Sequence, residues 1–307
     1  MINAIVFSKD KACQLELLLK SIRRNTSNLF DIKVIYEASN SLFRQGYEKL
    51  KEETFYHTKR DVNFPVRWYE RTEGNISLDI LNILNENRDL TCFLSDEDIL
   101  FSSPPSYREI INLFREKPVT AFSLRLGNNT IVQNPYSAKD YFIDKPRTGE
   151  FLFDKFLFWN ASDLKPFTNF AIPFSSHGHI HTTKLVKFVL EQTEINSFES
   201  FEKSLQDNLY MGIFGSLIPP YMACLEYNVL ITNVAEKISD PKPFDYGTGD
   251  FGMNERYLQD YKIDYDFFKF NGMSKPYQQF ITRFHRCLLY TSPSPRDVEE
   301  SRMPSSA

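Results

Sequence analysis

A chain of 307 residues with 42% hydrophobic content is long enough to bury a substantial core, in one large domain or two modest ones. Its formal net charge of −4, with no dense Lys/Arg run interleaved with aromatic residues, disfavours a nucleic-acid partner. The apolar runs are too short to span a membrane, and four cysteines without a Cys-x-x-Cys pair fit a reducing compartment, so we expect a soluble, cytoplasmic protein.

The first hundred residues alternate short apolar runs with segments of helical periodicity. The runs rich in β-branched and aromatic residues predict strands at 3–8, 32–36, 66–69 and 91–94. The periodic segments predict helices at 15–22, 42–53 and 76–84. This alternation indicates an α/β fold with a mostly parallel sheet flanked by helices, whose ligands gather at the carboxyl ends of the strands.

The rest of the chain is less regular. We expect a helix at 110–114, a strand at 120–126, an irregular aromatic stretch at 127–169, and helices at 180–190 and from Ser200. No linker divides the chain, so we predict one domain over 1–285, with a nucleotide-binding half at 1–126 and an aromatic-rich, acceptor-side half at 127–285. Residues 286–307 resemble translated adapter read-through and are expected to be a disordered, non-native tail.

Residues 93–98 read Phe-Leu-Ser-Asp-Glu-Asp and carry the strongest chemical signal. On an extended strand Asp96 and Asp98 would project to one side and Glu97 to the other. Two carboxylates held that close favour a hard divalent cation, which relieves their repulsion. The motif therefore predicts Mn²⁺ or Mg²⁺ on Asp96 and Asp98; the alternative is an acidic strand-to-loop junction that caps a helix or faces water.

Polar residues also follow the other strand ends, at Lys9-Asp10 and at 37–39, and should converge with the acidic motif on one crevice. Arg125 could pair with a diphosphate or with an Asp of the motif, or form a structural salt bridge. In the segment 176–181 three histidines recur at every second residue, a ligand-like spacing on a strand, with satisfied structural imidazoles as the alternative.

Together these segments resemble the GT-A fold glycosyltransferases, particularly bacterial family-2-like members, over roughly residues 2–285. The similarity is carried by 5–8, 34–39, 93–98, 121–127, 176–180, 200–202 and 228–233. It implies a nucleotide-sugar donor such as a UDP-sugar, a divalent metal on its phosphates, and inverting transfer to the hydroxyl of a carbohydrate or other acceptor. A role in surface polysaccharide biosynthesis, with peripheral membrane association, would be compatible with it.

The resemblance also suggests roles for single residues. Glu37 is expected to hydrogen-bond to the nucleoside, Lys9 or Asp10 to frame the uracil or ribose, and Ser8, Asp96 and Arg125 to contact the donor. His179 is expected as a diphosphate or acceptor contact or as a further metal ligand. Glu202 is expected to be the catalytic base, with Glu199 as its local competitor. His177 stands where similar sequences lead us to expect Asp, which weakens direct transfer of a role to that position.

Three other functions compete with this hypothesis. A sugar-phosphate nucleotidyltransferase normally carries an early glycine-rich loop, but residues 7–12 contain no glycine. A non-catalytic nucleotide- or carbohydrate-binding protein could retain a transferase fold, and metal-dependent turnover would distinguish it. A hydrolase ranks last, because the chain has no H-E-x-x-H, G-x-S-x-G or Walker motif.

Overall fold

The computed structural model describes most of the chain. Described are residues 1–60, 65–72, 74–130, 146, 150–152, 155–164, 168–210, 218, 220–233, 250–270, 273, 276–278, 280 and 282–286. The proposed tail beyond 286 and much of the irregular stretch 127–169 lie outside these residues.

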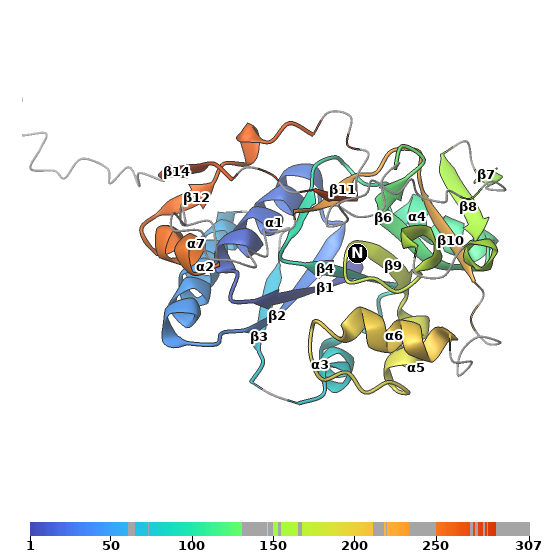
Figure 1. The fold of residues 1–307 in the computed structure, drawn as a ribbon, viewed down its shortest axis with the longest axis horizontal. Helices are drawn as coiled ribbons and strands as arrows, with labels where there is room; N and C mark the ends of the chain where they lie inside the picture. The colour runs from blue at the N-terminus through green and yellow to red at the C-terminus, as the bar shows by residue number, and fades with distance from the viewer. Residues whose placement is uncertain are drawn as a thin grey trace, which may run out of the picture.

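A nine-stranded sheet forms the centre of the molecule, in the order β3-β2-β1-β4-β9-β6-β10-β8-β7 (Figure 1). The pairings make seven strands run one way, with β9 and β8 reversed. The strands are β1 (Ile2–Lys9), β2 (Phe30–Glu37), β3 (Val66–Glu70), β4 (Leu90–Ser95), β6 (Val119–Gly127), β7 (Glu150–Leu152), β8 (Phe156–Asn160), β9 (His179–Thr182) and β10 (Tyr221–Leu225). The predicted α/β class with a mostly parallel sheet is confirmed.

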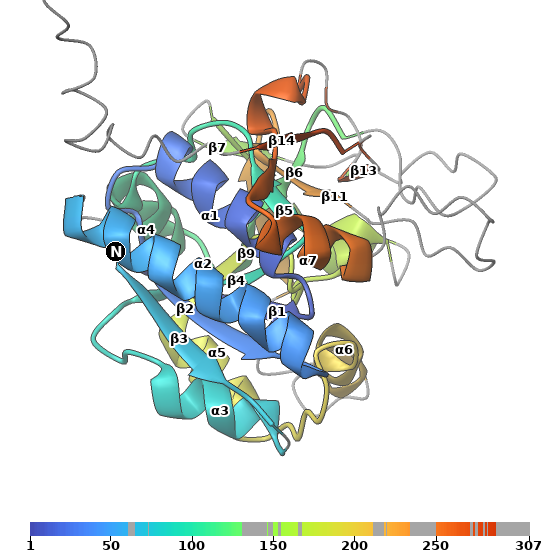
Figure 2. The same cartoon turned by 90° about the vertical axis from the view of Figure 1, so that its left-hand side faces the viewer.

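Helices cover both faces of this sheet. One face carries α1 (Ala12–Asn25), α2 (Ser41–Arg60), α4 (Tyr107–Glu116) and α7 (Asp250–Leu258). The other carries α3 (Ile76–Ile83), α5 (Thr183–Leu190) and α6 (Phe201–Tyr210), seen together in Figure 2. No helix among the described residues is long and apolar enough to cross a membrane.

The alternation of side chains along β1 explains the two layers. Ala4 and Val6 pack into the cluster under α1, whereas Ile5 and Phe7 pack into the cluster that includes α3, α5 and α6. All four are at least 96% buried, so β1 is apolar on both faces, as expected of a central parallel strand. After Asn3 near its start, polar side chains appear again at its carboxyl end, where Ser8 and Lys9 follow Phe7.

Smaller sheets complete the fold. β11 (Leu230–Asn233) lies between β5 (Asp98–Leu100) and β13 (Tyr277–Gln278), and β12 (Tyr261–Ile263) pairs with β14 (Phe284–Arg286). The pairing of β11 with β5 places Thr232 opposite Asp98. Residues more than 130 positions apart thereby meet directly behind the acidic motif.

Candidate functional site

A pocket of about 390 Å³ lies at the carboxyl ends of β1 and β4. One part of its lining comes from these strand ends: Phe7, Ser8, Lys9, Lys11, Ser95, Asp96 and Glu97. The other comes from the turn before β9 and the segment leading into α6: Ser176, His177, Phe198, Glu199 and Glu202. The predicted crevice at the strand ends is therefore present, and it gathers residues from both halves of the chain.

The acidic motif differs from its expected geometry. β4 ends at Ser95, and Asp96 and Glu97 form a turn before β5 begins at Asp98. The prediction that Glu97 points away while Asp96 and Asp98 share a face is wrong, because alternation holds only within an extended strand. Asp96 and Glu97 both line the pocket, and Asp98 does not.

Asp98 is fully buried, and both of its carboxylate oxygens accept hydrogen bonds. The backbone N–H of Ser95 donates to Oδ2 over 2.9 Å, and Thr232 Oγ1 donates to Oδ1 over 2.7 Å. His177 Nδ1 lies 3.0 Å from the same Oδ1. These partners hold the turn, β11 and the His177 ring together, a geometry that does not support the predicted role of Asp98 as a metal ligand.

Asp96 lines the pocket and accepts long hydrogen bonds from the strand ends. The backbone N–H of Lys9 donates to it over 3.2 Å, and Ser95 Oγ lies 3.3 Å away. Burial raises the pKa of Asp96 to about 7, although the Lys11 ammonium opposes this shift. Glu97 is paired with Lys11. The negative charge of Asp96 is thus poorly compensated by the protein, which is what a site for a cation requires.

The side chains of the pocket can supply only part of the ligands that a divalent cation needs. Among the described residues, no three His, Cys, Asp or Glu side chains are grouped so as to hold a metal. Asp96 and Glu97 bring two carboxylates to the pocket, and Mn²⁺ and Mg²⁺ accept such ligands together with phosphate oxygens. A diphosphate would therefore have to complete the coordination.

The predicted nucleoside contacts lie on the strand side of the pocket. Ser8 Oγ and Tyr47 Oη are 2.7 Å apart, and Lys9 Nζ lies 3.5 Å from both Glu37 and Glu199. Ser8 and Lys9 line the pocket. Glu37 pairs with Arg71 and contacts Lys9, which lines the pocket. The structure brings these three residues together as expected, and their role at a nucleoside stays a prediction.

Glu202 lines the pocket as an ionised carboxylate. Its Oε1 accepts hydrogen bonds from Ser175 Oγ over 2.6 Å, from the Ser176 backbone N–H over 2.7 Å and from Ser176 Oγ over 3.0 Å. Burial would raise its pKa, but the charges of His177 and Arg125 and these hydrogen bonds outweigh burial and hold the pKa of Glu202 at about 2. A carboxylate this acidic is a weak proton acceptor near neutral pH.

Arg125 lies behind Glu202 and does not line the pocket. The residue is 1% exposed, and its guanidinium stands 4.3 Å from the centre of the Tyr277 ring and donates through Nη2 to Ser175 Oγ over 3.4 Å. Nε and Nη1 have no hydrogen-bond partner among the described residues. This geometry supports an electrostatic role toward Glu202 more directly than the predicted donor contact.

His179 is also away from the pocket. It is fully buried on β9, with Nδ1 2.9 Å from the Pro173 carbonyl oxygen, and burial lowers its pKa to about 3. His181, two residues on, is buried in the same way against Phe174. Only His177 of the three histidines reaches the pocket, because it precedes β9 in a turn and so does not follow the strand alternation. The geometry does not support the predicted ligand contact of His179.

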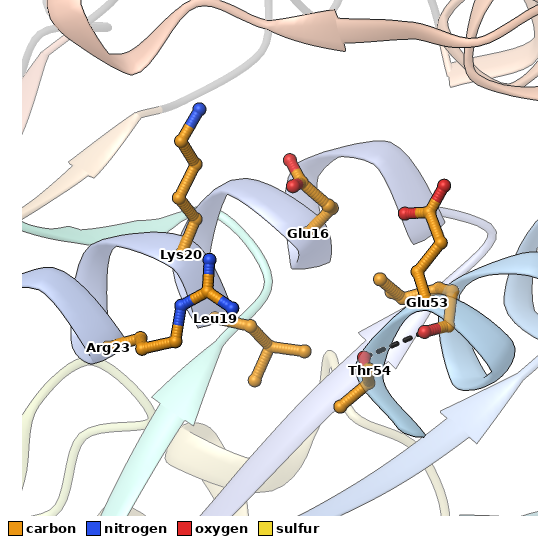
Figure 3. A pocket seen from close by; sticks show the side chains of 7 residues that line it. Glu16, Leu19, Lys20, Arg23, Glu53 and Thr54 are labelled. Atoms are coloured by element: carbon orange, nitrogen blue, oxygen red, sulfur yellow. Dashed lines mark hydrogen bonds between the residues drawn. The ribbon is translucent and has the colours of Figure 1, made fainter. Parts of the chain in front are cut away.

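A smaller pocket of about 30 Å³ lies between α1 and α2, with Glu16, Lys20 and Arg23 on one helix and Glu53 and Thr54 on the other (Figure 3). This is room for about one or two water molecules. Glu16 and Glu53 both pair with Lys262, at 3.7 and 2.7 Å. Its size and its internal ion pairs suit a structural role.

Comparison with protein-family models and with curated proteins found no match. Among solved structures, the chain is similar to S. aureus TarS 1–349 in complex with UDP-GlcNAc, with a TM-score of 0.46 and 9% identity over 75% of this chain and 57% of that one. It is also similar to a UDP-glucose pyrophosphorylase complexed with UDP-glucose, with a TM-score of 0.38 and 11% identity over 84% of this chain and 99% of that one.

A third similar structure is the WbbM bifunctional glycosyltransferase, with a TM-score of 0.28 and 14% identity over 44% of this chain and 23% of that one. The chain thus spans little more than half of the TarS 1–349 structure and less of WbbM. All three TM-scores are below 0.5.

Proposed function

We propose that this protein is a metal-dependent glycosyltransferase, which moves a sugar from a UDP-sugar or another nucleotide-diphosphate donor to an acceptor hydroxyl with inversion. One observation carries the proposal. A pocket at the carboxyl ends of parallel strands holds two carboxylates, Asp96 and Glu97, beside two lysines, and faces a second polar segment that contains His177 and Glu202.

The strand side of the pocket suits the donor. Lys9 and Lys11 are cations that can pair with phosphate oxygens, and Ser8 and Glu37 can hydrogen-bond to a nucleoside. A divalent ion on Asp96, with Glu97 nearby, would neutralise charge on the departing diphosphate. The carboxylates attract the metal and the metal attracts the diphosphate, so donor and metal should bind together.

The second polar segment suits the acceptor. Glu202 presents a carboxylate whose charge is fixed by its neighbours, and it can accept a hydrogen bond from an acceptor hydroxyl. Phe198 supplies an apolar surface of the kind on which a sugar ring packs. In an inverting reaction the acceptor oxygen attacks the anomeric carbon from the side opposite the diphosphate, which fits a pocket with two distinct sides.

A sugar-phosphate nucleotidyltransferase is the second candidate, and it would use the same lysines for a nucleoside triphosphate. The two functions differ in their products. We expect UDP to be released from at least one of UDP-glucose, UDP-galactose and UDP-GlcNAc in the presence of Mn²⁺, faster with a sugar acceptor than with water and abolished by EDTA. Release of pyrophosphate from UTP and a sugar 1-phosphate, without release of UDP from the sugars, would favour the nucleotidyltransferase.

A further inference from the structure

The structure fixes the orientation of the His177 imidazole ring. Its side chain is 15% exposed and lines the pocket, while Nδ1 lies 3.0 Å from the buried Oδ1 of Asp98. The ring stands nearly perpendicular to that of Tyr277, with an interplanar angle of 82° and centroids 5.9 Å apart. Three elements therefore fix one imidazole: the turn before β9, β5 and β13.

The hydrogen bond to Asp98 determines which nitrogen is free. Oδ1 and Oδ2 of an ionised carboxylate only accept, so Nδ1 carries the proton and donates it to Asp98. In the neutral ring Nε2 then has the lone pair, and it lies on the opposite edge of the ring from Asp98. Thr232 donates to the same Oδ1 and keeps the carboxylate from rotating. A carboxylate that orients an imidazole in this way also stabilises the imidazolium that forms when Nε2 takes a proton.

The comparison with Glu202 indicates which group is the better base. The three hydrogen bonds to Oε1 of Glu202 stabilise its charged form and weaken it as a proton acceptor. For His177, burial alone would lower the pKa, but the Asp98 carboxylate outweighs burial and the net pKa is raised. Hydrogen bonds from three donors therefore commit Glu202 to its charged, accepting role, and the geometry favours the oriented imidazole of His177 as the proton acceptor.

We propose that His177 is the general base of the transfer reaction and that Asp98 is its positioning residue, an assignment that rests on the proposed glycosyltransferase function. Nε2 of His177 takes the proton of the acceptor hydroxyl while the acceptor oxygen bonds to the anomeric carbon. The bond from that carbon to the diphosphate oxygen breaks, and its electron pair leaves with UDP. Glu202 then binds the acceptor and offsets the positive charge that develops on His177.

The test compares wild type, His177→Asn and His177→Ala, with UDP release from the UDP-sugar that wild type turns over best and with calorimetric UDP binding in Mn²⁺. Asn keeps a hydrogen-bonding group but cannot take a proton. We expect both variants to bind UDP within about threefold of wild type and to lose on the order of 10²- to 10⁴-fold in kcat, the usual contribution of a general base. Added imidazole should restore part of the His177→Ala rate. It should not change the rate of a Glu199→Gln variant, whose substitution lies in the same pocket.

A His177→Asn kcat near that of wild type would overturn the assignment. A loss of UDP affinity in that variant would also overturn it, because His177 would then be a donor or metal contact. So would a His177→Ala rate that imidazole does not raise. The proposed function is tested separately by wild type. If wild type releases no UDP from any UDP-sugar, the glycosyltransferase function fails and this assignment fails with it.

Discussion

The two aspartates of the acidic motif should respond in opposite ways to removal of their carboxylates. Asp98→Ala leaves three donors without an acceptor: the Ser95 N–H, Thr232 Oγ1 and His177 Nδ1. Each buried donor left unsatisfied costs about 1–3 kcal/mol, and His177 can recover part of this cost from water in the pocket. We therefore expect the free energy of unfolding to fall by about 3–5 kcal/mol.

Asp96 should behave differently because its charge is poorly compensated. A carboxyl group whose pKa rises from 3.8 to about 7 on folding destabilises the fold as pH rises through that window. Asp96→Asn removes this penalty, and at pH 8 it should raise the free energy of unfolding by about 1–4 kcal/mol. Below pH 4 the difference between Asp96→Asn and wild type should vanish.

Urea denaturation at pH 8, followed by circular dichroism, measures both effects in the same experiment. The protein should be free of divalent metal, since a bound cation would itself compensate Asp96. An Asp98→Ala variant as stable as wild type, or an Asp96→Asn variant that is less stable by more than about 1 kcal/mol, would refute the assignment of Asp98 to structure and Asp96 to the pocket.

Three further predictions concern local features of the fold. His181 is buried in its neutral form, because burial lowers its pKa to about 4, so the free energy of unfolding should fall as the pH drops below 6.5. His181→Phe should reduce this pH dependence by about 1.4 kcal/mol per pH unit, measured by urea denaturation from pH 6.5 to 4.5. An equal pH dependence in the variant and in wild type would contradict this prediction. Ser106→Ala removes the capping box of α4 and should cost about 0.5–2 kcal/mol, seen as a lower urea midpoint at unchanged slope. Gly178→Ala strains a backbone at φ +72° and places Cβ 3.1 Å from Leu230, so it should cost about 1–3 kcal/mol; a melting temperature equal to that of wild type would count against the steric argument.

The regular part of the fold could be predicted from the sequence because local pattern and tertiary environment agree there. The apolar runs at 3–8, 32–36 and 91–94 correspond to β1, β2 and β4 within about two residues at each end. The reversed strand β9 was suggested only by the alternation of its histidines, and its pairing was missed. Its sequence, His-Ile-His-Thr, is short, and its place between β4 and β6 depends on pairing with residues more than 50 positions away.

The site was predictable in position but not in detail. Alternation on an extended strand predicted Asp98 as a metal ligand, but the chain turns at Asp96 and Glu97, so Glu97 joins the pocket and Asp98 is buried. The sequence did carry a turn signal, since Ser and Asp, which turns favour, occupy three of the positions 95–98. Lys11 was missed because its approach to Glu97 crosses 86 residues of sequence. The histidine at position 177, where similar sequences lead us to expect Asp, became interpretable only once the structure placed Asp98 beside it.

Calorimetric titration of UDP tests whether Asp96 forms a metal-linked site for a nucleotide diphosphate. The titration should be run in Mn²⁺, in EDTA, and in Mn²⁺ with Asp96→Ala. We predict binding in the first condition and at least a tenfold loss of affinity, about 1.4 kcal/mol, in the other two. Equal binding in all three conditions, or no binding in any, would contradict the proposed site.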